Sequence, residues 1–265
     1  MKSTSGNHTR RRLPAPGKVT LAFVILLVVG ATMLVSAEER VLKKTIPVNE
    51  VDAIVLNGGN GSVHISVGAD DTIQIRVEIR PENLLDNKPL RGIKNWFLSS
   101  AYDDLDELMK AIRLEADLSM TGKIKIGLTP SVRTRESQVL EDWQITVPKR
   151  LAVKLAMARA TTTVDGVAGG VDISLGNGSV DVDVPGGDLD IVVTVGKARV
   201  RTGSESVGKL SLRSQVGNTK LSMNGMKMKY TDPPGPGSRF SLSGDGEDTI
   251  RVYVQVGDAS LRVNE

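Results

Sequence analysis

Cysteine is absent from this sequence of 265 residues, and histidine occurs only twice, as His8 and His64. The absence of cysteine excludes a disulfide framework, a thiolate metal site and acylation at a lipobox. Two histidines this far apart do not suggest a histidine-based metal site or a Ser-His-Asp triad. His64 stands between Val63 and Ile65 in an alternating pattern, so we expect its imidazole at the surface of a strand. The sequence therefore predicts no metal, no cofactor and no catalytic residue.

Aromatic residues are scarce as well, at 3% of the chain, whereas glycine occurs 27 times. A core without large aromatic anchors has to be built from many Val, Ile and Leu side chains, and β-branched side chains favour strands. The composition therefore favours thin, layered β structure.

Acidic residues are missing from the first eighteen positions, which hold five basic ones: Lys2, Arg10, Arg11, Arg12 and Lys18. The whole chain has 34 Lys and Arg against 31 Asp and Glu, so the formal net charge of +3 comes from this segment. The remainder is slightly acidic. It does not offer the basic face that nucleic acids need, and no nucleic-acid partner is expected.

Residues 19–37 form an apolar run without a charged side chain. As a helix with ~1.5 Å rise per residue it would extend about 28 Å, close to the thickness of a bilayer core. Basic residues before it, with Glu38 and Glu39 after it, predict that 1–18 is a cytoplasmic tail and that the rest lies outside, in the periplasm or at the cell surface. We expect a signal anchor in the cytoplasmic membrane. Because Val35-Ser36-Ala37 fits a signal-peptidase site, a cleaved signal peptide is the alternative.

The pentapeptide GNGSV occurs twice, at Gly59–Val63 and Gly176–Val180, and similar segments follow the second copy: VGKARV, VGNTKL and VGDASL. Their glycines are 20, 21, 20 and 20 residues apart, at Gly176, Gly196, Gly217, Gly237 and Gly257. Each glycine precedes a polar residue and an alternating apolar pattern, as at a tight corner between short strands. A fixed period of this size predicts an all-β, single-stranded β-helix or β-solenoid with rungs of about 20 residues, right-handed by analogy with parallel crossovers.

Residues 81–140 interrupt the repeat. Leu105, Leu108, Met109 and Ile112 have helical spacing, and strands are expected at Arg113–Met120 and Lys123–Leu128. Near Gly237 the apolar pattern shifts, which predicts a bulge or a register shift. Only Asn264 and Glu265 follow the last strand, so we expect an open edge there and self-association through the ends of the solenoid.

The sequence resembles the bacterial “putative adhesin” family of unknown function, whose members are single-stranded β-helices of the cell envelope. The resemblance rests on VLKKTIPVNEVDAIVLNGGNGSVHI, the helical interruption, WQITVPKRLAVKL and GNGSVDVDV, and it covers residues 40–265. It implies a membrane-tethered solenoid with the insertion 81–140. The family has no agreed catalytic or ligand residues, so it implies no site.

Charged side chains gather in two sets after the second GNGSV copy. Five aspartates cluster within a short segment, as carboxylates do in calcium-binding β-rolls. The sequence around them does not match the nonapeptide repeat of those rolls. They are Asp172, Asp181, Asp183, Asp188 and Asp190. Five bases follow and suggest either a basic stripe for anionic glycans or lipids, or partners for those acids on neighbouring rungs: Lys197, Arg199, Arg201, Arg213 and Lys220.

These observations predict a non-catalytic, membrane-tethered binding or structural module of the bacterial envelope, with an envelope protein or glycan as partner. The alternative is an extracytoplasmic component of envelope-stress sensing. Because the cytoplasmic tail is only about eighteen residues long, that role would act through another membrane protein. A remote alternative is a polysaccharide-active enzyme, which needs a cleft with paired carboxylates.

Overall fold

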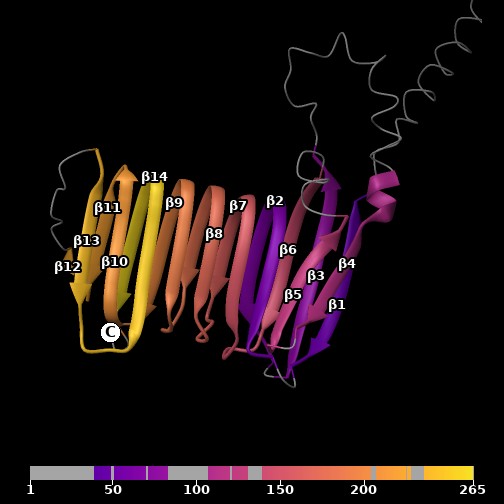
Figure 1. Ribbon diagram of the computed structural model, residues 1–265, viewed down its shortest axis with the longest axis horizontal. Coiled ribbons are helices and arrows are strands. Elements are labelled where there is room, and N and C mark those ends of the chain that lie inside the picture. The colour runs from indigo at the N-terminus through magenta and orange to yellow at the C-terminus, as the bar shows by residue number, and fades with distance from the viewer. Residues whose placement is uncertain are drawn as a thin grey trace, which may run out of the picture. The chain divides into compact units, whose positions relative to one another are not determined.

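The structure is a computed structural model that describes residues 39–264 apart from 49–50, 70, 83–106, 120, 131–138, 204–206, 225 and 228–235. The unit from Glu39 onward is all-β, as predicted, and its strands belong to one sheet (Figure 1). Along the sheet the order is β1-β3-β6-β2-β7-β8-β9-β14-β10-β13, with β4, β5, β11 and β12 paired off this path.

One end of the sheet is antiparallel. There β1 (Arg40–Pro47), β3 (Thr72–Pro81) and β6 (Val139–Val147) alternate in direction. Next to them lies β2 (Ala53–Val67), whose first part pairs with β5 (Lys123–Thr129) and whose last part pairs with β6. On its outer side β5 pairs with β4 (Arg113–Leu118).

The middle of the sheet is a run of parallel strands in register, which we call the parallel stack. It consists of β2, β7 (Ala152–Asp165), β8 (Val171–Asp183), β9 (Leu189–Gly203), β14 (Asp248–Asn264) and β10 (Val207–Val216), the last continued by β11 (Thr219–Met223). Beyond it come β12 (Met226–Lys227) on β11 and the antiparallel β13 (Ser238–Ser243) on β10.

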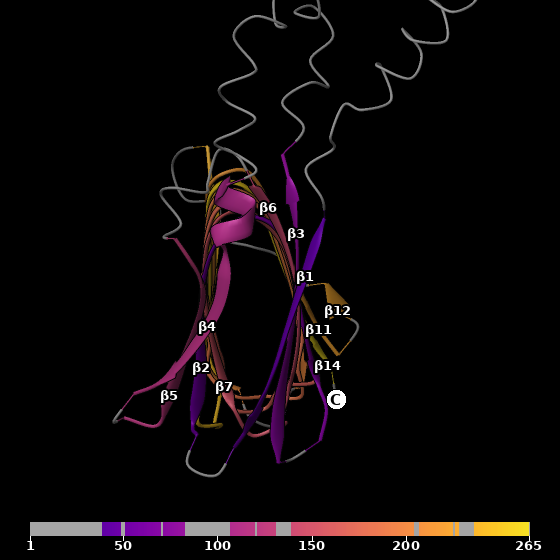
Figure 2. The same ribbon diagram turned by 90° about the vertical axis from the view of Figure 1, so that its right-hand side faces the viewer.

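Each long strand of the stack bends at a corner, and Figure 2, which looks along the row, shows the strands passing over between two layers. In β8 the buried side chains before the corner are Val171, Ile173 and Leu175, and those after it are Val180 and Val182. Register places equivalent side chains of neighbouring strands one above another, so the core consists of aliphatic ladders. Burying such a side chain stabilises by roughly 1.5–3 kcal/mol, which makes the ladders the main source of stability.

Five of the corners have a glycine with positive φ, whereas Ala160 occupies the equivalent position in β7. At Gly178, Gly196 and Gly257 φ is 137°, 146° and 131°, a region that side chains disfavour. A Cβ at Gly196 would lie 1.7 Å from the carbonyl oxygen of Gly178, because the corners stack directly on one another. Gly61 and Gly217 share this geometry, with φ of 144° and 139°.

Register explains why GNGSV occurs twice and corrects its alignment. Gly61 pairs with Ala160 of β7, and Ala160 pairs with Gly178, so the two copies occupy equivalent corners on either side of β7. Gly178, not Gly176, is the partner of Gly196, and the offset is 18 residues there. The predicted alignment on Gly176 was wrong because the corner needs positive φ, which Gly178 has and Gly176 does not.

The order of the last strands also differs from the prediction. The C-terminal strand β14 lies between β9 and β10, with Leu261 paired to Val200 on one side and Leu221 on the other. The predicted open edge at 260–263 is therefore wrong, because both sides of this segment are paired. Gly237 starts no rung: it precedes β13, which runs antiparallel to β10. The irregular register near this end falls between Val207 and Lys209 of β10 instead.

The interruption of the repeat is structured as expected where it is described. Residues 107–111 are helical, and Met109 and Ile112 are buried in the core. The two predicted strands are present as β4 and β5, but β5 joins the sheet beside β2. Antiparallel strands at both ends and the place of β14 mean that a regular solenoid of successive rungs is not confirmed.

The predicted anchor, residues 19–37, lies outside the described residues. From Glu39 onward, no helix in the described segments is long and apolar enough to cross a bilayer.

Candidate functional site

The parallel stack presents two outward faces, which we call the first face (strand residues before each corner) and the second face (those after it). On the first face one row contains Lys154, Asp172, Asp190 and Arg251, on β7, β8, β9 and β14. On the second face an equivalent row contains Thr163, Asp181 and Arg199. Each face therefore carries its own array of side chains, in which neighbouring side chains are one strand apart, and the corners separate the two arrays.

Acids and bases on both faces are paired between neighbouring strands. Lys154 Nζ lies 2.7 Å from Asp172 Oδ2, and Arg251 Nε donates to Asp190 Oδ1 at 2.7 Å. The hydrogen bond and the charge of Asp190 raise the pKa of Arg251 above its usual range. On the second face Arg201 bridges Asp181 and Asp183, at 3.3 and 3.2 Å. Of the two interpretations left open by the sequence, pairing across strands describes these charges.

The five predicted acids do not form a calcium site. Asp188, the remaining member, accepts a hydrogen bond from the Thr249 amide at 2.8 Å. Lys or Arg engages each of the other four, so the carboxylates are directed toward cations of the protein and not toward a common centre. Within the described segments no group of three His, Asp or Glu side chains is placed to hold a metal ion.

The five predicted bases do not form one stripe. Lys197, Arg199, Arg201 and Lys220 lie on the second face, but Arg213 precedes its corner and lies on the first face. Arg199 and Arg201 are engaged by aspartates, and Lys197 stands opposite Asp258. The corner at Gly217 divides the set, which the sequence spacing did not reveal.

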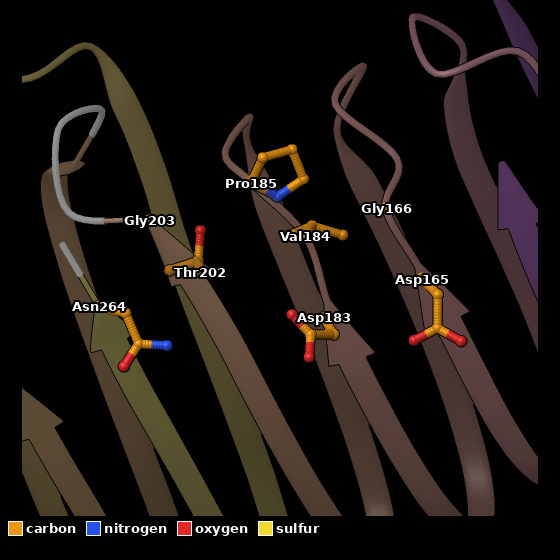
Figure 3. A pocket seen from close by; sticks show the side chains of 8 residues that line it. All are labelled: Asp165, Gly166, Asp183, Val184, Pro185, Thr202, Gly203 and Asn264. Carbon is orange, nitrogen blue, oxygen red and sulfur yellow. The ribbon is translucent and has the colours of Figure 1, made fainter.

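A pocket of about 520 Å³ lies where β7, β8, β9 and β14 end (Figure 3). Asp165, Asp183, Thr202 and Asn264 line it, with the backbone of Gly166 and Gly203. Asp183 is held by Arg201, and Asp165 lies 3.9 Å from His64, whose side chain is 52% exposed as predicted. The Thr202 hydroxyl is buried and has no hydrogen-bond partner among the described atoms. The pocket offers acceptors, but no nucleophile paired with a base.

A second groove, of about 370 Å³, lies on the first face toward β13 and is lined by Val192, Ser211, Arg213, Arg239, Arg251, Val252 and Tyr253. We call it the arginine groove. Three of its side chains are guanidinium groups, and the guanidinium of Arg213 lies 5.7 Å from the centre of the Tyr253 ring. Unlike the rows farther along the face, it has more bases than acids.

Comparison with known proteins supports the fold. No family model matches the chain, and no curated protein matches it. A crystal structure of a “putative cell adhesion protein” from Clostridium sporogenes ATCC 15579 is similar with a TM-score of 0.51 and 15% identity, covering 85% of this chain and 100% of that chain. The likeness is one of fold. It confirms the resemblance to adhesin-type proteins at that level.

Two further structures carry similar names but much lower scores. A “putative adhesin” from Bacteroides fragilis NCTC 9343 has a TM-score of 0.28 and 12% identity, covering 84% of this chain and 97% of that chain. Another from Parabacteroides merdae ATCC 43184 has a TM-score of 0.26 and 10% identity, with 85% and 97% covered. These scores are too low to support an inference.

One charged residue that the sequence analysis missed is Glu141 of β6, whose side chain is fully buried. Its Oε2 accepts hydrogen bonds from the Gly59 amide at 3.3 Å and the Trp143 indole at 3.1 Å. The signal was present in the sequence, because Glu141 stands in the apolar phase between Val139 and Trp143. It lines neither pocket, and its contacts are structural.

Proposed function

We propose that this chain is a non-catalytic binding module of the bacterial envelope, tethered to the cytoplasmic membrane by residues 19–37. In this proposal the parallel stack is a β-solenoid outside the cytoplasm. Its outward faces bind an envelope protein or a glycan, in the manner of an adhesin.

The observation that carries the proposal is the register of β7, β8, β9 and β14. Strands about 4.8 Å apart hold side chains of equivalent position in straight rows. The aliphatic ladders and stacked corners beneath them fix the backbone, so a ligand meets a preorganised surface that costs little ordering. Such a surface suits recognition of an extended or repeating partner.

The charges favour binding over catalysis. Acid–base chemistry on a glycan needs two carboxylates facing an enclosed bond, one of them with a raised pKa. Among the described residues, the pKa of the Glu39 carboxyl is raised, because a hydrogen bond with Glu78 and the charge of Glu78 favour its protonated form. This pair lies at β1 and β3, where Glu39 is exposed, and it lines neither described pocket.

The proposal is tested by crosslinking in cells with tagged full-length protein, followed by recovery from solubilised membranes. The comparison is a chain that begins at Glu38 and is exported by a cleavable signal peptide from another protein. We expect the full-length protein in the membrane fraction with its C-terminus accessible to protease in spheroplasts. We also expect the shorter, exported chain to keep the same partner or cell-wall glycan. Binding that is lost without residues 1–37 would favour the envelope-stress alternative over a binding face on the strands.

Turnover is measured with the same preparations. Incubation with isolated cell-wall polysaccharide should release no new reducing ends above the buffer blank. Release that depends on one Asp or Glu of the strands would overturn the non-catalytic proposal and favour the enzyme.

A further inference from the structure

The arginine groove differs from the rest of the first face in its charge balance. Arg251 at its margin is held by Asp190, so that guanidinium is neutralised. Arg213 of β10 and Arg239 of β13 are exposed and pair directly with each other in the antiparallel register. Neither forms an ion pair with any residue that the structure describes. Like charges directly opposite each other on neighbouring strands are destabilising, so the protein holds two positive charges together at a cost.

The groove is also preorganised. The guanidinium of Arg213 lies over the Tyr253 ring, 5.7 Å from its centre, in the range of a cation–π contact. The Tyr253 hydroxyl donates to Gln215 Oε1 at 2.7 Å, which fixes the ring from the far end. Arg213 is therefore held in place before any ligand arrives, and less side-chain freedom is lost on binding.

The chemistry of the groove selects an anion attached to a partly apolar body. Guanidinium groups present planar forks of N–H donors that match the oxygens of a carboxylate or sulfate group. Val192 and Tyr253 supply apolar surface beside them, and Ser211 supplies a hydroxyl. A broad anionic surface such as a membrane fits poorly, because Asp172 and Asp190 lie on the same face next to the groove.

Within the proposed function, which this inference deepens, we propose that the arginine groove binds an acidic sugar residue of an envelope glycan. The carboxylate or sulfate of the sugar lies between Arg213 and Arg239, and the sugar ring contacts Val192 and Tyr253. The two unbalanced charges of the groove are then matched by the ligand.

The test uses the full-length chain in detergent micelles and isothermal titration calorimetry with four probes. Trigalacturonic acid presents carboxylates, a sulfated galactose trisaccharide presents sulfates, galactotriose is the neutral control, and hexaglutamate is the peptide control. We expect at least one acidic trisaccharide to bind about tenfold or more tightly than galactotriose, because charge-assisted hydrogen bonds are roughly twice as strong as neutral ones. The tighter of the two identifies the anion, and its affinity should fall as NaCl is raised.

Variants locate the site. Arg239→Gln and Arg213→Gln should each lower the affinity for the acidic trisaccharide about tenfold. Arg262→Gln, on the second face, should leave that affinity unchanged. Arg239→Gln removes a like-charge contact, so its midpoint of thermal unfolding without ligand should equal or exceed that of the parent. Arg213→Gln also loses the contact with the Tyr253 ring, so its midpoint should stay close to that of the parent.

Three results would overturn the inference: equal affinity for acidic and neutral trisaccharides, unchanged affinity in both groove variants of normal stability, or tighter binding of hexaglutamate through the same arginines. The last would assign the groove to an acidic protein segment. None of these results bears on whether the full chain binds the envelope, so the proposed function is judged separately by the crosslinking experiment.

Discussion

The two GNGSV copies have the same five residues and the same register, yet their surroundings differ. In β8 the corner is open to solvent, with Asn177 exposed, whereas in β2 Gly58, Gly59 and Asn60 are buried. The difference comes from the neighbours. The strand β8 pairs with β7 and β9 along its length, but on one side β2 pairs with β5 up to Leu56 and with β6 from Asn60 onward.

The gap between β5 and β6 explains the buried Glu141. Asn57, Gly58 and Gly59 have no register partner in either strand, and the Gly59 amide donates to the Glu141 carboxylate. In β8 the neighbouring strands leave only Gly176 without a register partner, so the interruption there is one residue and not three. The same sequence motif therefore serves a regular corner at one place and a break in the sheet at the other, and the residues around it decide which.

The largest effect is expected where both copies are alike. Gly61→Ala and Gly178→Ala each force positive φ on a side chain and place Cβ 2.2 and 1.9 Å from the carbonyl oxygens of Glu141 and Ala160. Each should lower the free energy of unfolding by at least about 3 kcal/mol in urea denaturation. Ala160→Gly in the strand between them is the control and should cost no more than about 1 kcal/mol. A small loss at either glycine would contradict the stacked corners.

The next effect should be confined to the first copy. Glu141→Leu leaves the Gly59 amide and the Trp143 indole without their acceptor, and each buried donor left unsatisfied costs about 1–3 kcal/mol. We expect a loss of about 2–3 kcal/mol by urea denaturation and a smaller loss for Glu141→Gln, which keeps an acceptor oxygen. Gln144→Leu, at an exposed position of the same strand, serves as the control. Equal stability of all three variants would mean that Glu141 does not bridge the gap.

A smaller effect of opposite sign is expected in β7, between the copies. The Thr162 hydroxyl is buried without a hydrogen-bond partner in the described part of the chain, between Val63 and Val180 in register. Thr162→Val should therefore raise the free energy of unfolding by about 1 kcal/mol. Thr161→Val, at an exposed position, should change it by less than about 0.5 kcal/mol. Destabilisation by Thr162→Val would show that the hydroxyl has a partner after all.

The smallest effect is expected from the ion pairs near the second copy. Arg201→Gln removes contacts to Asp181 and Asp183, which are partly exposed. Exposed pairs contribute about 0–1 kcal/mol, and the loss should shrink further at high NaCl. A loss above about 2 kcal/mol that is insensitive to salt would mean that these charges are part of the core structure.

The alternation of apolar residues and the spacing of glycines were enough to predict the all-β fold class and most of the buried aliphatic residues. Ladders such as Val171, Ile173 and Leu175 follow directly from period-2 patterning, which depends only on local geometry. The corner was misplaced by two residues because GNGSV contains two glycines, and sequence alone does not tell which one needs positive φ. Glu141 was missed although its phase in β6 marked it as inward-facing.

Strand order could not be read from the sequence. VGNTKL and VGDASL have the same pattern, so either fits beside β9, and the period carries no information about which one does. The arginine groove depends on that order, because it joins Tyr253 of β14, Arg213 of β10 and Arg239 of β13. Long-range pairing brought these side chains together, and neither motif nor charge spacing indicated it.

The most direct test of the account is therefore a disulfide between β9 and β14. The chain has no cysteine, so Lys197→Cys with Asp258→Cys introduces the only two thiols, at positions paired in register. Neighbouring strands have Cα separations that suit a disulfide. We predict that this pair links on oxidation, seen by peptide mapping. Lys197→Cys with Asn218→Cys should not link, because Asn218 lies at the bend between β10 and β11, on the far side of β14 from β9. Linkage of the second pair without the first would place β10 beside β9 and would remove the basis of the arginine groove.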